Sequence, residues 1–415
     1  MMMNNSYSST LLKYENNIFK YIADDQGIDE STINPEFNYP PIFTSSTFFL
    51  APENQTAIGL MSASDADADV LIFTISHSEI TISPTGVLTF VTAPDYETKS
   101  TYSAIVTVSD GYNSVSQSIN INIDNIEEPG TNLVAQEKGI IDGQITYEDI
   151  SREFILYVPE SYSSSSKKPL VFNFHGYTSS ADEYITYGDL RPQADTNGFI
   201  LVYPNALKDT QDKSYWNIGG WSTSIHDDTK FIKNLISVLI NKYSIDEKRI
   251  YSTGFSNGGF FSFHLACNLN ESFAAIASVA GSITPDTFKE CIPKKPLPVL
   301  QIHGLVDPIV PYSGTTVLGV RNSTKPVLEV MEYWKNNNNC DQYILSNGQN
   351  SGDGESRIDT YEYSNCLNGT QNIHLLINGA GHIWPGSASV SIQSPNASKI
   401  IWDFFSKYDI NGVIQ

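Results

Sequence analysis

The sequence predicts an α/β domain with a mostly parallel sheet, preceded by a small all-β sandwich, and three observations support this. The chain has 415 residues, more than one hydrophobic core usually organises, so two domains are expected. Residues 40–128 contain short segments of alternating apolar and polar residues, punctuated by Gly, Pro, Asn and Asp, which is typical of a sandwich. Beyond residue 130, short apolar runs alternate with helix-length amphipathic segments, which predicts βαβ units.

The composition restricts the possible partners. Acidic residues outnumber basic residues 46 to 24, giving a formal net charge of −22. A surface of this sign repels phosphate backbones, so no nucleic-acid partner is expected. The chain contains no apolar run of roughly 18 residues, so no membrane span is expected either. The sequence does not indicate an oligomeric state.

The chain divides by pattern into three parts. Residues 1–38 are polar, rich in Asn and Ser, and expected to be flexible. The sandwich is expected over 39–129, and the stretch "NIEEPGTN" with its Pro-Gly pair then acts as a linker. The α/β catalytic domain is expected over 130–415.

Within the α/β domain, a hairpin over 143–162 is expected to lead into the buried strands. Residues 229–242 predict a helix, because their apolar residues recur at i, i+4, i+5 and i+8. The buried strands are expected in the apolar runs 169–176, 199–206, 249–256, 274–281, 297–304 and 373–382, most of which end in small residues or turns.

The stretch "YSTGFSNGGF" at 251–260 carries the first candidate catalytic residue. Its G-x-S-x-G pattern is weak alone, but a predicted strand precedes Ser256 and the predicted helix "GFFSFHLAC" follows it. This strand–turn–helix context is the one in which a serine hydroxyl is exposed as a nucleophile. Gly254 and Gly258 leave room for so tight a turn. The alternative is a glycine-rich turn with an idle serine.

A nucleophilic serine needs a histidine base and an orienting carboxylate. Of the seven histidines, His382 alone lies in a loop beyond the last predicted strand, in the order Ser, acid, His. Asp307 follows the strand 297–304 and is the expected acid; a simple turn-forming role is the alternative. The backbone N–H groups of Tyr177 and Asn257 are expected to form the oxyanion hole.

Loop residues near the carboxyl ends of the strands are candidates for the substrate pocket. Trp216, Asn217 and Trp384 follow predicted strands, and His175 lies in the "FHGYTSS" loop. An aromatic plane at this edge suits a cinnamoyl ring, a sugar or a polyester. The alternative is that the tryptophans only cover the core.

The four cysteines predict two disulfides and an exported protein whose leader is not in this numbering. They fall as Cys267 with Cys291 and Cys340 with Cys366, and each pair closes a local loop. No C-x-x-C spacing points to a zinc or redox site. Four free buried thiols are the alternative.

Several motifs together resemble the polyhydroxybutyrate-depolymerase-like esterases, which are allied to feruloyl and acetylxylan esterases. They include "PLVFNFHGYTSSADEY", "RIYSTGFSNGGFFSFHLAC", "VLQIHGLVDPIVPYSG" and "AGHIWPG", in family order over about 131–408. The resemblance implies an α/β-hydrolase fold and the roles given above for Ser256, Asp307 and His382. It also implies the Cys267–Cys291 bond. Departures are two phenylalanines at 260–261 and an Asn-rich insertion around 336–355.

The N-terminal segment resembles a cadherin repeat over 41–129, through "APENQ", "DADAD", "PDYE" and "INIDNIEEP". In that family acidic clusters bind Ca²⁺, which prefers six to eight oxygen ligands. Solvated acidic loops are the alternative, because a single repeat leaves each site to be completed by a neighbour. The candidate ligands are Glu53, Asp65, Asp67, Asp95, Glu97 and Asp124.

The sequence therefore predicts a secreted serine carboxylesterase that forms an acyl-enzyme and needs no cofactor for catalysis. The expected substrates are feruloyl or acetyl esters on plant polysaccharide. A hydroxyalkanoate polyester is the alternative substrate. An adhesion protein with an inactive hydrolase domain is the alternative of another class.

Overall fold

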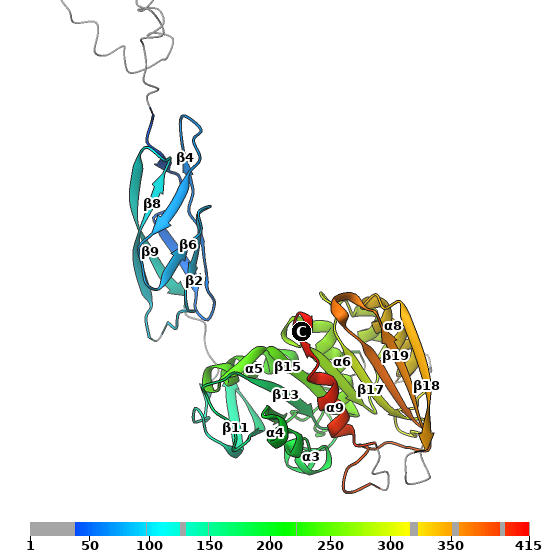
Figure 1. Ribbon diagram of the computed structural model, residues 1–415. Helices are drawn as coiled ribbons and strands as arrows, with labels where there is room; N and C mark the ends of the chain where they lie inside the picture. Colours follow the sequence, from blue (N-terminus) through cyan, green and yellow to red (C-terminus); the bar gives the residue numbers. More distant parts are fainter. Residues whose placement is uncertain are drawn as a thin grey trace, which may run out of the picture. The chain divides into compact units, whose positions relative to one another are not determined.

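The computed structural model describes two compact units of the chain (Figure 1). The boundary between the units falls within 125–129, outside the described residues. The expected flexible segment also lies outside them, apart from Asn38. The described residues are 38–96, 98–124, 130–147, 149–220, 222–315, 323–350, 357–390 and 395–414.

The N-terminal unit is a β-sandwich. A four-stranded sheet in the order β2-β9-β8-β5 and a three-stranded sheet in the order β3-β7-β6 enclose one apolar core, and β1 pairs with β4. Alternation along β9 explains the burial, because Ile119, Ile121 and Ile123 face the core while the residues between them are exposed. The strands are β1 (Ile42–Phe43), β2 (Phe48–Pro52), β3 (Ala57–Leu60), β4 (Ala63–Ser64), β5 (Ile72–Ile75), β6 (Ile80–Ile82), β7 (Val87–Phe90), β8 (Thr101–Ser109) and β9 (Ser114–Asp124).

The C-terminal unit is built on one eleven-stranded sheet. Its order is β10-β11-β12-β14-β13-β15-β16-β17-β20-β19-β18, and the six strands from β14 to β20 are all parallel. Antiparallel strands extend the sheet on both sides. The strands are β10 (Gly130–Thr131), β11 (Gly139–Tyr147), β12 (Ile150–Val158), β13 (Lys168–Phe174), β14 (Ile200–Pro204), β15 (Ile245–Phe255), β16 (Ala275–Val279), β17 (Val299–Gly304), β18 (Gln342–Asn350), β19 (Arg357–Ser364) and β20 (Asn372–Ile377), with a separate pair β21 (Tyr408–Asp409) and β22 (Gly412–Val413).

Helices cover both faces of this sheet (Figure 1). Apolar residues of α5, α6 and α8 form one core with the strands, and those of α3, α4 and α9 form the other. None of the helices in the described part of the chain has the length and apolar character needed to cross a bilayer. The helices are α3 (Ala181–Tyr187), α4 (Arg191–Asn197), α5 (Asp228–Lys242), α6 (Asn257–Asn268), α7 (Pro285–Glu290), α8 (Val327–Asn337) and α9 (Ala397–Phe405), with short 3₁₀ turns η2 (Asn270–Ser272) and η3 (Leu367–Gly369).

The central strands are mostly apolar because both of their faces are covered. In β13, Leu170 and Phe172 pack into the core under α5 and α6, while Val171 packs into the core under α9. Every residue from 169 to 174 is buried. This explains why these strands show continuous apolar runs and not the alternation seen in the sandwich.

The Asn-rich segment around 336–355 begins at the end of α8, and residues 342–350 of it form the edge strand β18. β18 pairs antiparallel with β19, so the segment extends the sheet.

Both expected disulfides are present, and no cysteine is free. Cys267 at the end of α6 is bonded to Cys291, which directly follows α7. Cys340 is bonded to Cys366, which closes the segment containing the β18–β19 hairpin.

A buried ion pair joins β12 to the start of α5. Arg152 Nη2 lies 2.6 Å from Asp228 Oδ1, and both side chains are at most 1% exposed. Asp228 Oδ2 also accepts a hydrogen bond from the Asn217 N–H. Asp227 is the N-cap of α5 and accepts from the Lys230 N–H. Asp228 instead fixes the 216–217 loop.

Replacing Arg152 by Met is expected to lower the free energy of unfolding by about 3–5 kcal/mol, because the Asp228 carboxylate would be buried without its partner. Urea unfolding followed by tryptophan fluorescence measures this. All five tryptophans lie beyond residue 215, so the signal reports on the C-terminal unit alone.

The matched control is Arg191→Met, which removes a half-exposed pair with Asp189. We expect a loss of at most about 1 kcal/mol for this variant. Equal urea midpoints for Arg152→Met and the wild-type chain would show that the buried pair does not support the fold.

Candidate active site

Ser256 stands at the junction of β15 and α6, in a backbone conformation that few residues adopt. Its φ is 53° and its ψ is −120°, a strained combination for a residue with a side chain. Its N–H donates to the Val279 carbonyl on the neighbouring strand, and its carbonyl accepts from the Phe260 N–H in the helix. The turn is therefore held from both sides, and Ser256 lines the surface of two adjoining hollows.

Two glycines make this turn possible by allowing close backbone contacts. A Cβ on Gly258 would lie 2.1 Å from the Phe174 carbonyl oxygen at the end of β13. A Cβ on Gly254 would lie 2.6 Å from the backbone of Gly258. Neither contact can be relieved by rotating a side chain, so only glycine fits at these positions.

Asp307 and His382 come together from the loops after β17 and β20. His382 Nδ1 lies 2.8 Å from Asp307 Oδ2. The Val306 N–H donates to the Ala380 carbonyl and ties the two loops together. Because Nδ1 faces the carboxylate, the other ring nitrogen of His382 is left to serve the hollow that this residue lines.

The Asp307 carboxylate is stabilised in its ionised form. Burial raises its pKa, but the hydrogen bond and charge of His382 and the N–H groups of Val310 and Ile309 together lower the pKa below its usual range. A depressed folded-state pKa stabilises the fold at pH values above the unfolded pKa of about 3.9. This stabilisation is lost as the pH falls through the folded-state pKa.

His175 orients the peptide that carries the Tyr177 N–H. Its Nδ1 lies 2.7 Å from the Gly176 carbonyl, and its Nε2 accepts from the Ala206 N–H at 3.1 Å. Burial lowers the pKa of His175 to about 4, so the ring is neutral and donates through Nδ1. In a trans peptide the Tyr177 N–H points opposite to the Gly176 carbonyl. Among the described residues, this N–H donates to no protein acceptor.

Asn257 takes part in the site through both its backbone N–H and its side chain. Its N–H is in the first turn of α6, where it has no helical partner. Its side-chain Oδ1 accepts from the Trp216 N–H at 2.8 Å, and its Nδ2 donates to the Trp216 carbonyl. Trp216 Nε1 in turn donates to the His175 carbonyl at 3.1 Å. Trp216 therefore connects the Asn257 side chain to the loop that carries the Tyr177 N–H.

Two hollows meet at Ser256. The first, the Tyr215 hollow, has a volume of about 340 Å³ and is lined by Tyr177, Tyr215, Thr223, Ser256, Asn257 and Phe260 among others. The second, the Glu183 hollow, has a volume of about 460 Å³ and is lined by Tyr177, Ser179, Glu183, Tyr187, Ser256 and His382 among others.

The expected pocket residues are corrected by the structure. His175 and Trp216 are 0% exposed, and Trp384 is 1% exposed. Trp216 stacks on Phe261 with ring centroids 4.9 Å apart. The Asn217 side chain donates to the His226 carbonyl. None of these residues lines either hollow within the described chain; they hold the loops that do.

Trp384 anchors the His382 loop to the rest of the unit. Its N–H donates to the Tyr187 hydroxyl, and its indole Nε1 donates to Ser398 Oγ on α9. Its ring meets Tyr184 edge-to-face at 5.9 Å. The tryptophan therefore positions His382 from the buried side.

One neighbour of the acid was not predicted as part of the site. His303 Nε2 lies 3.6 Å from Asp307 Oδ2 and 2.8 Å from the Val310 carbonyl. Burial lowers the pKa of His303, which favours the neutral ring behind the carboxylate. Other described aspartates between Ser256 and His382 in the chain do not line the hollows: Asp341 is exposed, and Asp359 pairs with Arg357.

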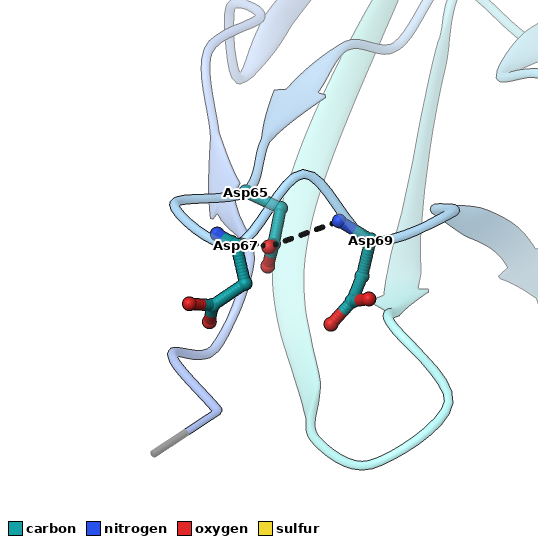
Figure 2. Close-up of side chains that lie close together, drawn as sticks. All are labelled: Asp65, Asp67 and Asp69. Atoms are coloured by element: carbon teal, nitrogen blue, oxygen red, sulfur yellow. Dashed lines mark hydrogen bonds between the residues drawn. The ribbon is translucent and has the colours of Figure 1, made fainter. Parts of the chain in front are cut away.

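In the N-terminal unit, the described residues bring one group of three carboxylates together. Ligand atoms of Asp65, Asp67 and Asp69 all lie within 4.8 Å of one another. Figure 2 shows the Asp65 carboxylate within this turn, where its Oδ1 accepts from the N–H groups of the other two residues. Asp69 was not among the predicted ligands, although the D-x-D-x-D spacing was visible in the sequence.

The other predicted calcium ligands lie outside this turn. Glu53 is buried and its Oε2 accepts from the Tyr96 N–H. Asp95 accepts from the N–H and hydroxyl of Thr98. Asp124 is exposed at the end of β9, and Glu97 lies outside the described residues. Among the described residues, the turn 65–69 is thus the group of carboxylates whose donor chemistry fits a hard cation.

Known proteins are similar to this chain in sequence. Residues 162–319 match the family model described as Phospholipase/Carboxylesterase. Feruloyl esterase B of Piromyces equi is 27% identical over 266 residues, which cover 62% of this chain and 46% of that protein. A bifunctional acetylxylan esterase/xylanase of Neocallimastix patriciarum is 25% identical over 264 residues, covering 64% of this chain and 34% of that protein. The chain thus spans less than half the length of these relatives.

These matches confirm the predicted resemblance to feruloyl and acetylxylan esterases and the α/β-hydrolase fold class. Among solved structures, an acetyl xylan esterase from Aspergillus awamori aligns with a TM-score of 0.45 and 17% identity, covering 61% of this chain and 94% of that one.

The N-terminal unit matches a different family model. Residues 38–122 match the model described as Bacterial Ig domain, which agrees with the observed β-sandwich. The cadherin likeness and the bound calcium remain predictions.

If the N-terminal unit binds Ca²⁺, millimolar Ca²⁺ is expected to raise the Tm of its calorimetric transition, and EDTA is expected to reverse the shift. The reason is mass action, because an ion that binds only the folded state stabilises it. Asp65→Asn removes a central carboxylate and is expected to abolish the shift. Glu79→Gln, outside the cluster, is the charge-matched control. An unchanged transition with Ca²⁺ would leave the turn as solvated acidic surface.

Proposed function

We propose that the C-terminal unit is a serine carboxylesterase in which Ser256 is the nucleophile, His382 the base and Asp307 the residue that orients it. The observation that carries this proposal is the 2.8 Å contact between Asp307 and His382, with His382 and the strained Ser256 lining the same hollow. Acyl transfer through a serine requires a hydroxyl as nucleophile, an imidazole as base and a carboxylate that orients the imidazole.

In the proposed reaction, Ser256 Oγ attacks the ester carbonyl carbon while His382 Nε2 takes the hydroxyl proton. The carbonyl oxygen becomes an oxyanion and accepts hydrogen bonds from the Tyr177 and Asn257 N–H groups. The ester C–O bond then breaks, and His382 returns the proton to the departing alkoxide. A water molecule, activated by His382, releases the carboxylic acid and restores Ser256.

The size and lining of the Tyr215 hollow favour an aromatic acyl group over acetyl. Its volume of about 340 Å³ is at the lower end of the range for drug-sized ligands, and an acetyl group would leave most of it empty. Tyr177 and Tyr215 meet edge-to-face at 5.3 Å, and Phe260 forms another part of the wall. The names of the feruloyl esterase relatives also favour an aromatic acyl group. A polyester acyl chain remains the alternative substrate.

We further propose that the protein is secreted and that its ester is attached to a polymer. The pairing of all four cysteines supports export, because disulfides persist in oxidising compartments. The Ig-like N-terminal unit is proposed to serve as a spacer or surface-binding module beside the esterase.

Ser256→Ala is expected to reduce the turnover of p-nitrophenyl acetate by roughly 10⁴-fold or more, because no other group supplies the nucleophile. The matched control is Ser252→Ala, which removes a buried hydroxyl from β15, four residues away. This variant is expected to retain activity. Turnover that survives in Ser256→Ala, or is missing from the wild-type protein, would refute the esterase proposal and favour an inactive hydrolase domain.

Among methyl ferulate, acetylated xylan and polyhydroxybutyrate, methyl ferulate is expected to give the highest kcat/KM, because only its acyl group fills the Tyr215 hollow. Side-by-side initial rates of the wild-type protein measure this. A clear preference for polyhydroxybutyrate would favour the polyester alternative, and a preference for acetylated xylan would show that the hollow does not hold the acyl group tightly.

A further inference from the structure

Ser256 lies between two hollows that differ in chemistry. Tyr177, Ser256 and Ile309 line both of them. Asn257, one of the two proposed oxyanion donors, lines only the Tyr215 hollow, whereas His382 lines only the Glu183 hollow. An ester likewise has two parts, its acyl group and its alcohol. The position of His382, which carries the proton in the proposed reaction, indicates which part lies in which hollow.

We propose that the Tyr215 hollow holds the acyl group and that the Glu183 hollow holds the alcohol, a polyhydroxylated one such as a sugar. The assignment rests on the proposed function. His382 must return a proton to the leaving alkoxide oxygen, so that oxygen and its substituent lie on the His382 side of Ser256. The acyl group then extends to the other side, past the Asn257 N–H that holds the carbonyl oxygen.

The Glu183 hollow offers groups that suit a sugar. Glu183 Oε2 accepts from Ser179 Oγ at 3.0 Å, and a carboxylate has further lone-pair positions for ligand hydroxyls. The Tyr187 hydroxyl accepts from the Trp384 N–H, so its own proton can be donated to the ligand. The rings of Tyr187 and Phe255, 5.3 Å apart, give an apolar wall against which the C–H face of a sugar ring can pack. Charge-assisted hydrogen bonds from sugar hydroxyls to Glu183 would select the polyol.

The lining of the Tyr215 hollow includes the hydroxyl of Thr223 as well as aromatic side chains. Thr223 Oγ1 donates its proton to Asp209 Oδ2. Burial raises the pKa of Asp209, but hydrogen bonds from Thr223 and from the Lys213 and Gln211 N–H groups lower it below its usual range. The carboxylate is therefore ionised and can only accept, which fixes the direction of the Thr223 hydroxyl. The Thr223 oxygen is left as an acceptor for a hydroxyl on the acyl group, such as a phenol.

The assignment is tested by two selectivity ratios, each measured as kcat/KM for two substrates of the same variant. The alcohol ratio compares methyl 5-O-feruloyl-arabinofuranoside with methyl ferulate, which share the acyl group. The acyl ratio compares methyl ferulate with methyl 3,4-dimethoxycinnamate, which share the alcohol and differ in the phenolic hydroxyl. A ratio within one variant is insensitive to the fraction of protein that is folded.

Glu183→Gln is expected to lower the alcohol ratio about tenfold, since it removes a charged acceptor. Asp182→Asn removes an exposed carboxylate from the same turn of α3, outside both hollows, and is expected to keep the ratio. Thr223→Val is expected to lower the acyl ratio about tenfold, whereas Thr223→Ser retains the hydroxyl and is expected to keep it.

Each outcome decides part of the assignment. An alcohol ratio unchanged by Glu183→Gln overturns the sugar site, and an acyl ratio unchanged by Thr223→Val overturns the acyl site. If Glu183→Gln changes the acyl ratio and Thr223→Val changes the alcohol ratio, the two hollows are reversed. Failure of the proposed function itself is seen separately, as wild-type protein without esterase turnover or as turnover that survives in Ser256→Ala.

Discussion

The site depends on one backbone contact, the approach of Gly258 to the carbonyl of Phe174. A Cβ at 258 would lie 2.1 Å from that oxygen, so α6 can begin directly against the end of β13 only because residue 258 has no side chain. This contact brings the first turn of the helix beside the 175–177 loop. It thereby brings the residues of the two proposed oxyanion donors, from segments about 80 residues apart in the chain, to the hollow that Ser256 also lines. The strain at Ser256 is sustained because the strands and the helix around the turn are fixed by the core.

Hydrogen bonds extend this constraint into the surrounding loops. The Asn257 side chain binds the backbone of Trp216, the Trp216 indole binds the His175 carbonyl, and the His175 ring binds the Gly176 carbonyl. Each link uses a buried polar group whose partner is also buried, where an unmade hydrogen bond would be costly. Asp228 adds a second tie through the Asn217 N–H. The donors are thus positioned by buried residues that do not line the hollows, which is the arrangement that electrostatic preorganisation requires.

Much of the fold and of the candidate site could be predicted from the sequence. The side-chain positions that were predicted wrongly have a common physical cause. The buried strands, the strand–turn–helix around Ser256 and the chain order of Ser256, Asp307 and His382 are local or sequential features, and a single sequence contains them. The direction in which a loop tryptophan points depends on distant partners. Trp216 turns inward because Asn257 and His175 bind it, and Trp384 does so because Ser398 binds its indole. The polar segment 342–350 likewise forms strand β18 by pairing with β19, a partner that lies outside the segment itself.

The proposed acid and base are held separately from the proposed nucleophile and oxyanion donors. Asp307 and His382 lie on the loops after β17 and β20, which the Val306–Ala380 hydrogen bond joins, and Gly304 lets these loops pass within van der Waals distance. Ser256 and the donors are fixed by β13, β15 and α6. Ser256 and His382 line the Glu183 hollow together, so an ester bound as proposed would lie between the two groups. In the proposed mechanism, proton transfer requires that the leaving oxygen lie beside His382, and the same requirement would determine which end of the substrate each hollow recognises.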